Sequence, residues 1–204
     1  MQYENTSREE AQPDSAGSIP ALGTKETKMR DLIVWPNPIL RQPVNLVTEF
    51  DENLQNLVDD MFRIMETYKG AGLAAPQVGE RKSVVIYNCD GEKGTLINPV
   101  LTPIEDAKVE EFGEGCLSFP GVYVNIARPN IFKLQWQDVT GKFEEDEFYG
   151  FVALAIQHEL DHLQGKTLVN YLPGVKRDFV TRKMMKIQKR KKLYQRQLKK
   201  LGKK

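Results

Sequence analysis

An apolar run at residues 151–156 (FVALAI) leads directly into the polar segment at residues 157–162 (QHELDH). The run contains no proline, few of its residues are β-branched, and Gly165 follows shortly after it. Glycine is the residue type that most often lies just past the last turn of a helix. The pattern therefore predicts a buried helix that ends near Gly165.

A second helix is indicated further upstream by apolar residues at helical spacing. These residues are Leu54, Leu57, Val58, Met61, Phe62 and Met65, and the pattern stops at Lys69-Gly70. Strand-like runs bounded by Gly, Pro, Asn and Asp lie at 83–88, 95–101, 122–126, 131–137 and 143–149. We expect an α+β fold, with antiparallel β-sheets packed around the central helix that begins near residue 151, plus a C-terminal helix.

The domain organisation follows from composition along the 204 residues. Residues 1–28 are polar and aperiodic, and they are expected to form a disordered leader. We expect the folded domain at 29–173, followed by a basic helical tail at 174–204. No apolar run approaches the roughly 18 residues of a membrane span. Two cysteines and no secretory signal favour a reducing, cytoplasmic compartment, where a free thiolate can bind a metal.

The C-terminal tail concentrates the positive charge of the chain. From Lys176 to Lys204, fourteen Lys and Arg residues stand against the single acid Asp178, a net charge of +13. Since the whole chain carries +1, the rest carries −12. The tail also has a narrow apolar stripe, formed by Val180, Met184, Ile187, Tyr194, Leu198 and Leu201. A basic amphipathic helix of this kind favours a polyanionic partner, and a solvated tail without a partner is the alternative.

The polar segment of the central helix has the pattern of a metal site. His158 and His162 are four residues apart, so they lie on one face of a helix and can bind the same ion. Glu159 is placed to reach a water molecule on that ion. The alternative is a pair of core histidines whose nitrogens are satisfied by backbone groups.

A third ligand has to come from elsewhere, because the chain contains only two histidines. The position where a metzincin has its third histidine is Leu168, and Asp178 is the only acid downstream of His162. Upstream, the soft donors are Cys89 and Cys116. Cys89 ends a strand-like run, where a small packed residue is common, whereas Cys116 follows a glycine in a predicted loop. The sequence therefore favours Cys116.

The segment Gly70–Gln77 (GAGLAAPQ) contains a loose match to the dinucleotide-binding pattern G-x-G-x-x-A. That pattern needs a strand before it and a helix opening within it. Here a predicted helix precedes the glycines, and Pro76 blocks a helix from continuing. The segment is instead interpreted as a loop whose bare backbone can approach a ligand, with a simple turn as the alternative.

Three segments together resemble the bacterial peptide deformylases. That family is marked by G-x-G-L-A-A-x-Q, E-G-C-L-S and Q-H-E-x-D-H, which stand here as Gly70–Gln77, Glu114–Ser118 and Gln157–His162. The similarity extends from about Met29 to Leu172. The resemblance implies a metal-dependent enzyme that hydrolyses the formyl group from N-formylmethionine at the start of nascent polypeptides, with release of formate.

The resemblance also implies the division of work in the site. The metal would be Fe²⁺, with Zn²⁺ or Ni²⁺ as substitutes, held by Cys116, His158, His162 and a water molecule whose pKa the metal lowers. Glu159 would transfer the proton. The Gln77 amide and the Leu117 backbone N–H would stabilise the oxyanion together with the metal.

Substrate contacts are expected from the helix face that carries the metal ligands and from the glycine-containing segments. An apolar slot for the methionine side chain is expected there, and the alternative is that these apolar residues are simply core. The candidate substrate-binding residues are Gly70, Ala71, Gly72, Phe112, Gly115, Phe151, Leu154 and Ala155.

Two further positions matter to the resemblance. Arg128 matches an arginine that pairs in the family with the glutamate at the position of Glu114, which would hold the Cys116 loop in place. In some members of the family an arginine at a position near Tyr123 contacts the substrate backbone, and this chain lacks that arginine.

The resemblance implies docking of the C-terminal helix on the ribosome, and we expect a monomer with no membrane contact. Two other classes of function stay open on the residues alone: a zinc metallopeptidase with the same metal helix, and a basic-tailed ribosome- or RNA-binding module with a structural metal. Structural metal sites usually have four protein ligands, and only three are found here, which favours catalysis.

Overall fold

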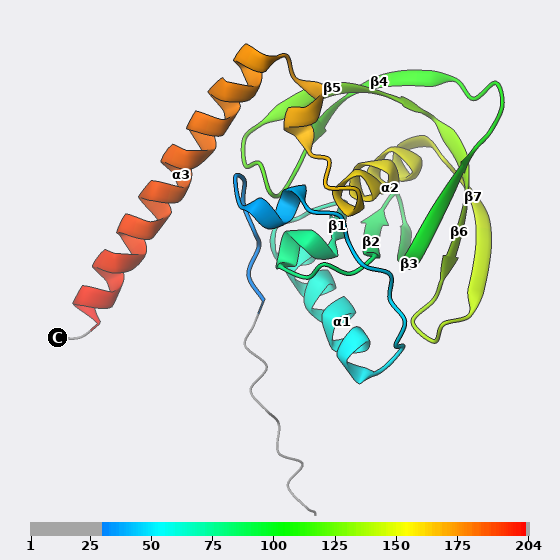
Figure 1. The fold of residues 1–204 in the computed structure, drawn as a ribbon, viewed down its shortest axis with the longest axis horizontal. Coiled ribbons are helices and arrows are strands. Elements are labelled where there is room, and N and C mark those ends of the chain that lie inside the picture. The colour runs from blue at the N-terminus through cyan, green and yellow to red at the C-terminus, as the bar shows by residue number, and fades with distance from the viewer. Residues whose placement is uncertain (1–29, 203–204) are drawn as a thin grey trace, which may run out of the picture.

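A computed structural model describes residues 30–202 of the chain, so the predicted leader lies outside the described residues. The fold is α+β, as expected (Figure 1). Its helices are α1 (Glu52–Thr67), α2 (Gly150–Leu163) and α3 (Gly174–Leu201), with short 3-10 turns η1 (Pro38–Arg41), η2 (Ala75–Val78) and η3 (Leu168–Tyr171). Its strands are β1 (Gly72–Ala74), β2 (Val84–Cys89), β3 (Glu92–Pro103), β4 (Val109–Gly115), β5 (Tyr123–Pro129), β6 (Ile131–Gln137) and β7 (Phe143–Tyr149).

The strands form two antiparallel sheets. Five of them make one sheet in the order β1-β2-β3-β6-β7, and β4 pairs with β5 in a second, two-stranded sheet. The pattern of the sequence does not reveal β1 or β4. β1 has only three residues, all buried, and β4 (VEEFGEG) is charged, glycine-containing and without an alternating apolar face. Pairing with β5 determines its conformation.

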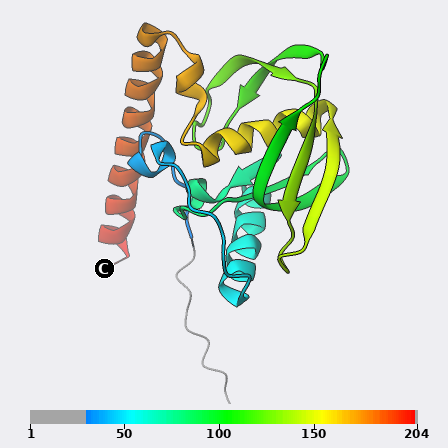
Figure 2. The same cartoon turned by 45° about the vertical axis from the view of Figure 1, so that its right-hand side comes forward.

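Helix α2 runs through the middle of the domain, between the large sheet and the β4–β5 sheet (Figures 1 and 2). Its apolar residues pack on the large sheet; Ala153 and Ile156 are fully buried in that cluster. The helix ends where predicted: Gly165 has φ +71° just past the C-cap, and a Cβ there would lie 2.7 Å from the Arg41 carbonyl oxygen. Glycine is required at this position for both reasons.

Helix α1 covers the β1–β2 end of the large sheet. Its N-terminus is capped by Asp51, whose carboxylate accepts a 3.0 Å hydrogen bond from the Leu54 N–H. Most of the apolar stripe predicted for this helix is buried in a cluster that also contains Leu73, Val84 and Ile86, and Phe62 packs against this cluster partly buried. The strand β1 and the turn η2 are therefore held between α1 and α2.

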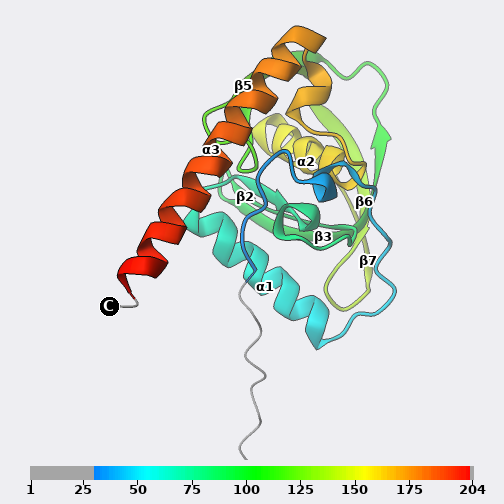
Figure 3. The ribbon, with the colours of Figure 1, turned by 60° about the vertical axis from the view of Figure 1, so that its left-hand side comes forward.

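Helix α3 lies along the outside of the domain, beside the first described residues of the chain (Figure 3). Val180 and Met184 are buried in a cluster with Trp35 and Phe119. The Trp35 Nε1–H donates to Thr181 Oγ1 over 3.1 Å. The predicted apolar stripe is thus buried only in the first half of the helix.

Further along α3, Tyr194 and Leu198 are exposed, at 62% and 49%. The basic residues of this half therefore project from a helix that is fixed at its beginning and surrounded by solvent toward its end. Within residues 30–202, none of the helices has the length and apolar content needed to cross a membrane.

Candidate metal centre

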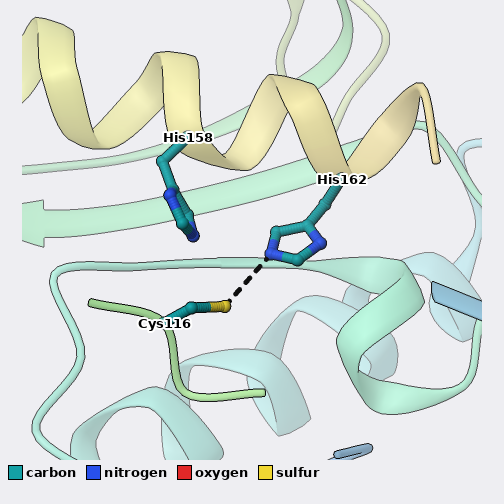
Figure 4. Close-up of side chains that lie close together, drawn as sticks. All are labelled: Cys116, His158 and His162. Carbon is teal, nitrogen blue, oxygen red and sulfur yellow. Dashed lines mark hydrogen bonds between the residues drawn. The ribbon is translucent and has the colours of Figure 1, made fainter. Parts of the chain in front are cut away.

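The structure brings the three predicted ligands together. One donor atom each from Cys116, His158 and His162 lies within 4.8 Å of the other two. The Cys116 Sγ is 3.3 Å from His162 Nε2, and the ring centroids of the two histidines are 5.2 Å apart (Figure 4). Sulfur and imidazole donors at this separation can share a single ion between them.

Two elements place these side chains. His158 and His162 point from the same face of α2, as their spacing requires. Cys116 is the first residue after β4, in the turn that follows Gly115. Because β4 is paired with β5 along its whole length, the position of the thiol depends on a sheet that α2 itself does not belong to.

The donor atoms fit a metal ion. His158 Nδ1 is 2.7 Å from Glu114 Oε2, so its Nε2 is left facing the other two ligands, and this buried atom has no hydrogen-bond partner among the described residues. A buried imidazole nitrogen without a partner carries an energetic cost, which an ion between the three ligands would remove. The chemistry of the set, two imidazoles and one thiol, suits zinc, iron or nickel better than magnesium or calcium.

The two imidazoles have opposite electrostatic environments. Burial disfavours a charge on His158, but the negative charges of Cys116 and Glu114 outweigh it and raise the pKa of this imidazole well above its usual value. Burial lowers the pKa of His162 well below its usual value. The negative groups around His158 therefore favour a cation at the point where the three donors meet.

Glu159 lies next to this point and is almost completely buried, with 5% of its surface exposed. Its Oε2 has no hydrogen-bond partner among residues 30–202. Burial raises the pKa of its carboxyl to about 7, because water no longer stabilises the charged form. Gly72 gives it space: a Cβ at that position would lie 2.8 Å from Glu159 Cγ. A carboxyl of this kind can gain or lose a proton near neutral pH.

The Gln77 amide is fixed in one orientation. Its Oε1 accepts a 2.8 Å hydrogen bond from the Ala74 N–H, so its NH₂ group must face the other way. There Nε2 lies 3.3 Å from Ser118 Oγ and 3.6 Å from Cys116 Sγ. Ser118 is itself held by donating a 2.7 Å hydrogen bond to the Ile33 carbonyl. The amide donors are thus directed at the ligand side of the centre.

Leu117 combines a backbone donor with a packed side chain. Within the described part of the chain, its N–H donates to no backbone carbonyl. Its side chain contacts the Gly70 position so closely that a Cβ there would lie 2.8 Å from Leu117 Cδ1. The packing of the side chain against a bare glycine backbone keeps this free N–H in place.

A buried ionic network surrounds the Glu114–His158 contact. Arg128 donates to both Glu114 oxygens and, over 2.9 Å, to Asp161 Oδ2. Asp161 also accepts a 2.6 Å hydrogen bond from the Tyr171 hydroxyl, and burial together with this carboxylate raises the pKa of Tyr171 to about 12. Arg128 is 6% exposed, so its ion pairs with Glu114 and Asp161 are shielded from water, whereas Tyr171 is 40% exposed. The predicted Glu114–Arg128 pair is present.

Asp161 and Tyr171 have no role assigned from the sequence. Asp161 stands within the motif that contains both histidines, which is a usable signal, whereas nothing in the sequence around Tyr171 connects it to the centre. Tyr171 reaches Asp161 because it lies in the turn η3.

A cavity of about 660 Å³ opens beside the centre. His158 and Glu159 form part of its wall, while His162 and Gln77 are each 1% exposed and lie behind it. All eight candidate substrate-binding residues line it: Gly70, Ala71, Gly72, Phe112, Gly115, Phe151, Leu154 and Ala155. Tyr123 and two residues of α3, Ile187 and Lys191, also line it, and the sequence does not place these α3 residues at the site.

Comparison with protein families and known sequences gives one consistent result. The polypeptide deformylase family model matches residues 29–178. The peptide deformylase of Zymomonas mobilis is 39% identical over 163 residues, covering 76% of this chain and 92% of its own length. A chloroplastic peptide deformylase 1B of Oryza sativa is 42% identical over 139 residues, covering 66% of this chain and 51% of its own length.

Solved structures show the same fold. A peptide deformylase from Legionella pneumophila superimposes with a TM-score of 0.74 at 35% identity, covering 80% of this chain and 98% of its own. The peptide deformylase of Ehrlichia chaffeensis in complex with actinonin gives a TM-score of 0.73 at 34% identity, covering 78% and 96%.

Proposed function

The chain belongs to the peptide deformylase family, hydrolases that use a divalent metal to remove the formyl group from N-formylmethionine peptides, and we propose how its residues divide this work. It is thus a deformylase of protein biosynthesis. The observation that carries the assignment of residues is that Cys116, His158 and His162 converge next to Glu159, on one side of a single cavity.

The metal is proposed to be Fe²⁺, held by Cys116, His158 and His162, with Zn²⁺ or Ni²⁺ able to take its place. A thiolate and two neutral imidazoles leave a divalent ion with about one net positive charge, and soft ligands select against magnesium and calcium. When bound, such an ion supplies a Lewis acid and lowers the pKa of a coordinated water molecule.

Glu159 is proposed to move the proton. Its carboxyl, with a pKa of about 7 caused by burial and one oxygen without a partner among the described residues, takes a proton from the attacking water. It then delivers this proton to the departing amine of the methionine. The space above Gly72 lets the side chain lie beside the scissile formyl group.

Gln77 and Leu117 are proposed to stabilise the negative oxygen that forms during attack. The Gln77 NH₂ is oriented by the bond between Ala74 N–H and its own oxygen, and the Leu117 N–H has no backbone acceptor in the described residues. Donors that are held in place before the reaction lower its barrier, because they need no rearrangement when the charge develops.

The formylmethionine side chain is proposed to occupy the apolar part of the cavity. Phe151, Leu154 and Ala155 precede His158 on α2, and Phe112 and Ala71 line the same cavity from other elements. Gly70, Gly72 and Gly115 also line the cavity, and the absence of a side chain at each leaves room for Leu117, Glu159 and Tyr123 respectively. A formyl carbon carries only hydrogen, so a close wall around the metal excludes acetyl and larger groups.

Formate release tests the function directly. Purified protein, with its metal content measured anaerobically, is supplied with formyl-Met-Ala-Ser and, separately, with the unformylated peptide. We expect formate from the first and no peptide-bond cleavage in either. Cleavage of the unformylated peptide would favour a metallopeptidase instead.

The basic half of α3 is proposed to bind ribosomal RNA. Exposed Lys and Arg residues surround the part of α3 beyond the buried cluster, and phosphate contacts from such residues are strongly salt-dependent. Truncation at Gly174 would also remove the buried Met184, so charge removal is the cleaner test. We expect weaker ribosome binding and a shallower salt dependence when Lys189, Arg190, Lys192 and Arg196 are replaced by Gln, and no change when Lys108 and Lys133 are replaced.

The chain is proposed to act as a cytoplasmic monomer. Every residue given a role in the site comes from one chain, so a partner is not needed to complete it. Cys89 and Cys116 are unpaired, and a thiol ligand needs a reducing compartment. Light scattering after size-exclusion chromatography tests the monomeric state, and cell fractionation tests the cytoplasmic location.

A further inference from the structure

Helix α3 contributes to the wall of the substrate cavity as well as to the outer surface of the domain. Ile187 and Lys191 are four residues apart, on one face of the helix, and both line the cavity that contains His158 and Glu159. Ile187 is partly buried against the cluster around Trp35, while Lys191 is exposed. Lys191 is therefore an exposed, positively charged residue in the wall of the substrate site.

Hydrogen bonds fix the part of α3 around Ile187 and Lys191 to the domain. The Gln188 side-chain amide, between these two residues, donates to the Val34 and Trp35 carbonyl oxygens over 2.7 and 3.0 Å. One turn earlier, Lys183 Nζ donates to the Gly121 carbonyl over 2.7 Å, which ties α3 to the loop that follows Cys116. The position of Lys191 relative to the metal centre is thus set by direct contacts with the domain.

The accessible charge of the cavity is positive. Two lysines and two glutamates line it: Lys69, Lys191, Glu114 and Glu159. Both carboxylates are withdrawn from solvent, because Glu114 is bonded to Arg128 and His158 and Glu159 is 5% exposed. Neither Lys69 nor Lys191 has an ion-pair partner in the described part of the chain. The exposed charged residues of the cavity wall are therefore the two lysines.

We propose that Lys191 is a specificity-determining residue that recognises a carboxylate on the peptide, downstream of the formylmethionine. This inference rests on the proposed function, since it concerns the segment of the same substrate that leaves the site. The cavity, at about 660 Å³, is large enough for several residues of an extended peptide beyond the first. Formylated chains with an early acidic residue are the preferred substrates.

The size and kind of the effect follow from the position of Lys191. An exposed ion pair changes binding by about two- to fivefold, and salt screens it. The carboxylate is remote from the bond that breaks, so its contact with Lys191 is the same in the bound substrate and in the transition state. Uniform binding of this kind appears in KM and leaves kcat unaffected.

Matched peptides measure this preference. Formyl-Met-Ala-Asp-amide is compared with formyl-Met-Ala-Asn-amide, which has the same shape without the charge, and the acid is then moved to the second and fourth positions. We expect kcat/KM to be about two- to fivefold higher for the best-placed Asp peptide at low ionic strength, through KM. The preference should disappear in Lys191→Gln, return in Lys191→Arg, and persist in Lys192→Gln.

A terminal carboxylate is a second source of the same charge. Formyl-Met-Ala-Ser with a free carboxylate is therefore compared with its amide, and dependence of this ratio on Lys191 also supports the recognition of a carboxylate. A nascent chain offers only the side-chain form, so the Asp–Asn pair decides the biological preference.

Three results would overturn the proposal: equal KM values for all charged and neutral pairs, a preference that survives Lys191→Gln, or an equal loss in Lys192→Gln. Turnover of the Asn peptide reports the deformylase activity itself, independently of any preference. If turnover were absent, peptide dissociation constants measured with the Glu159→Gln protein would still give the ratio for the Asp–Asn pair. A failure of the proposed deformylase function can thus be distinguished from a failure of the proposed role of Lys191.

Discussion

The carboxylate of Glu114 lies 2.7 Å from Nδ1 of His158 and accepts a hydrogen bond from this N–H, which leaves Nε2 directed at the other two ligands. Glu114 is itself held by Arg128, whose second contact reaches Asp161 on α2. The strand that carries the Cys116 loop and the helix that carries the histidines are therefore connected by buried ion pairs. The arrangement of the ligands depends on this connection as much as on the ligands.

Replacement of Glu114 tests that connection. Glu114→Ala removes the acceptor of the His158 proton and leaves Arg128 with only Asp161, so we expect metal affinity to fall by about 10- to 100-fold. Chelator competition under anaerobic conditions measures the affinity. Glu111→Ala, on the same strand but exposed, is the matched control and should bind metal normally. Normal affinity in Glu114→Ala would show that the contact does not orient His158.

The two cysteines offer an internal comparison. Cys116→Ala should abolish stoichiometric metal binding, because it removes one of three donors that lie within 4.8 Å of each other. Cys89→Ala should retain the metal: Cys89 ends β2 away from the centre, and burial raises the pKa of its thiol to about 11. Metal analysis of both proteins settles the assignment, and the opposite result would transfer the ligand role to Cys89.

Glu159→Ala should separate metal binding from turnover. The metal content should stay at one ion per chain, while kcat falls by about 10²- to 10⁴-fold, the usual contribution of a general acid–base group. Formate release and metal analysis on the same sample measure both quantities. A variant that keeps its activity would refute the proton-transfer role.

Gln77 is expected to act mainly in the transition state. Gln77→Leu removes an oriented donor, and we expect kcat to fall by about 10²- to 10³-fold with a much smaller change in KM. Gln77→Glu is a useful companion, since its carboxylate can still accept from the Ala74 N–H but lacks the NH₂ donors. Steady-state kinetics should show the same fall in kcat for both variants. A change in KM without a fall in kcat would contradict the assignment.

A pair of adjacent methionines tests whether α3 belongs to the folded core. Met184 is fully buried beside Trp35 and Phe119, and Met184→Ala should lower the free energy of unfolding by about 2–5 kcal/mol. Met185 is 55% exposed, so Met185→Ala should change it by less than about 0.5 kcal/mol. Denaturant unfolding measures both. Equal stability of the two variants would mean that the helix docks only weakly.

The elements that sequence predicts best are those whose signals are local. Helix α2, its end at Gly165 and the shared face of His158 and His162 follow from spacing within a dozen residues, because helix geometry repeats every 3.6 residues. Cys116 was selected by the absence of other donors and by its flanking glycine. The three motifs then indicated the family, and the comparisons confirm it.

Other features depend on contacts between distant segments. β4 has no pattern of its own and exists because it pairs with β5, and Tyr171 reaches Asp161 only through the path of η3. The sequence alone determined which residues carry the chemistry, since their type and spacing are local properties. Only the tertiary structure decided that α3 closes one side of the cavity, because that depends on Met184 packing near Trp35, about 150 positions away in the chain.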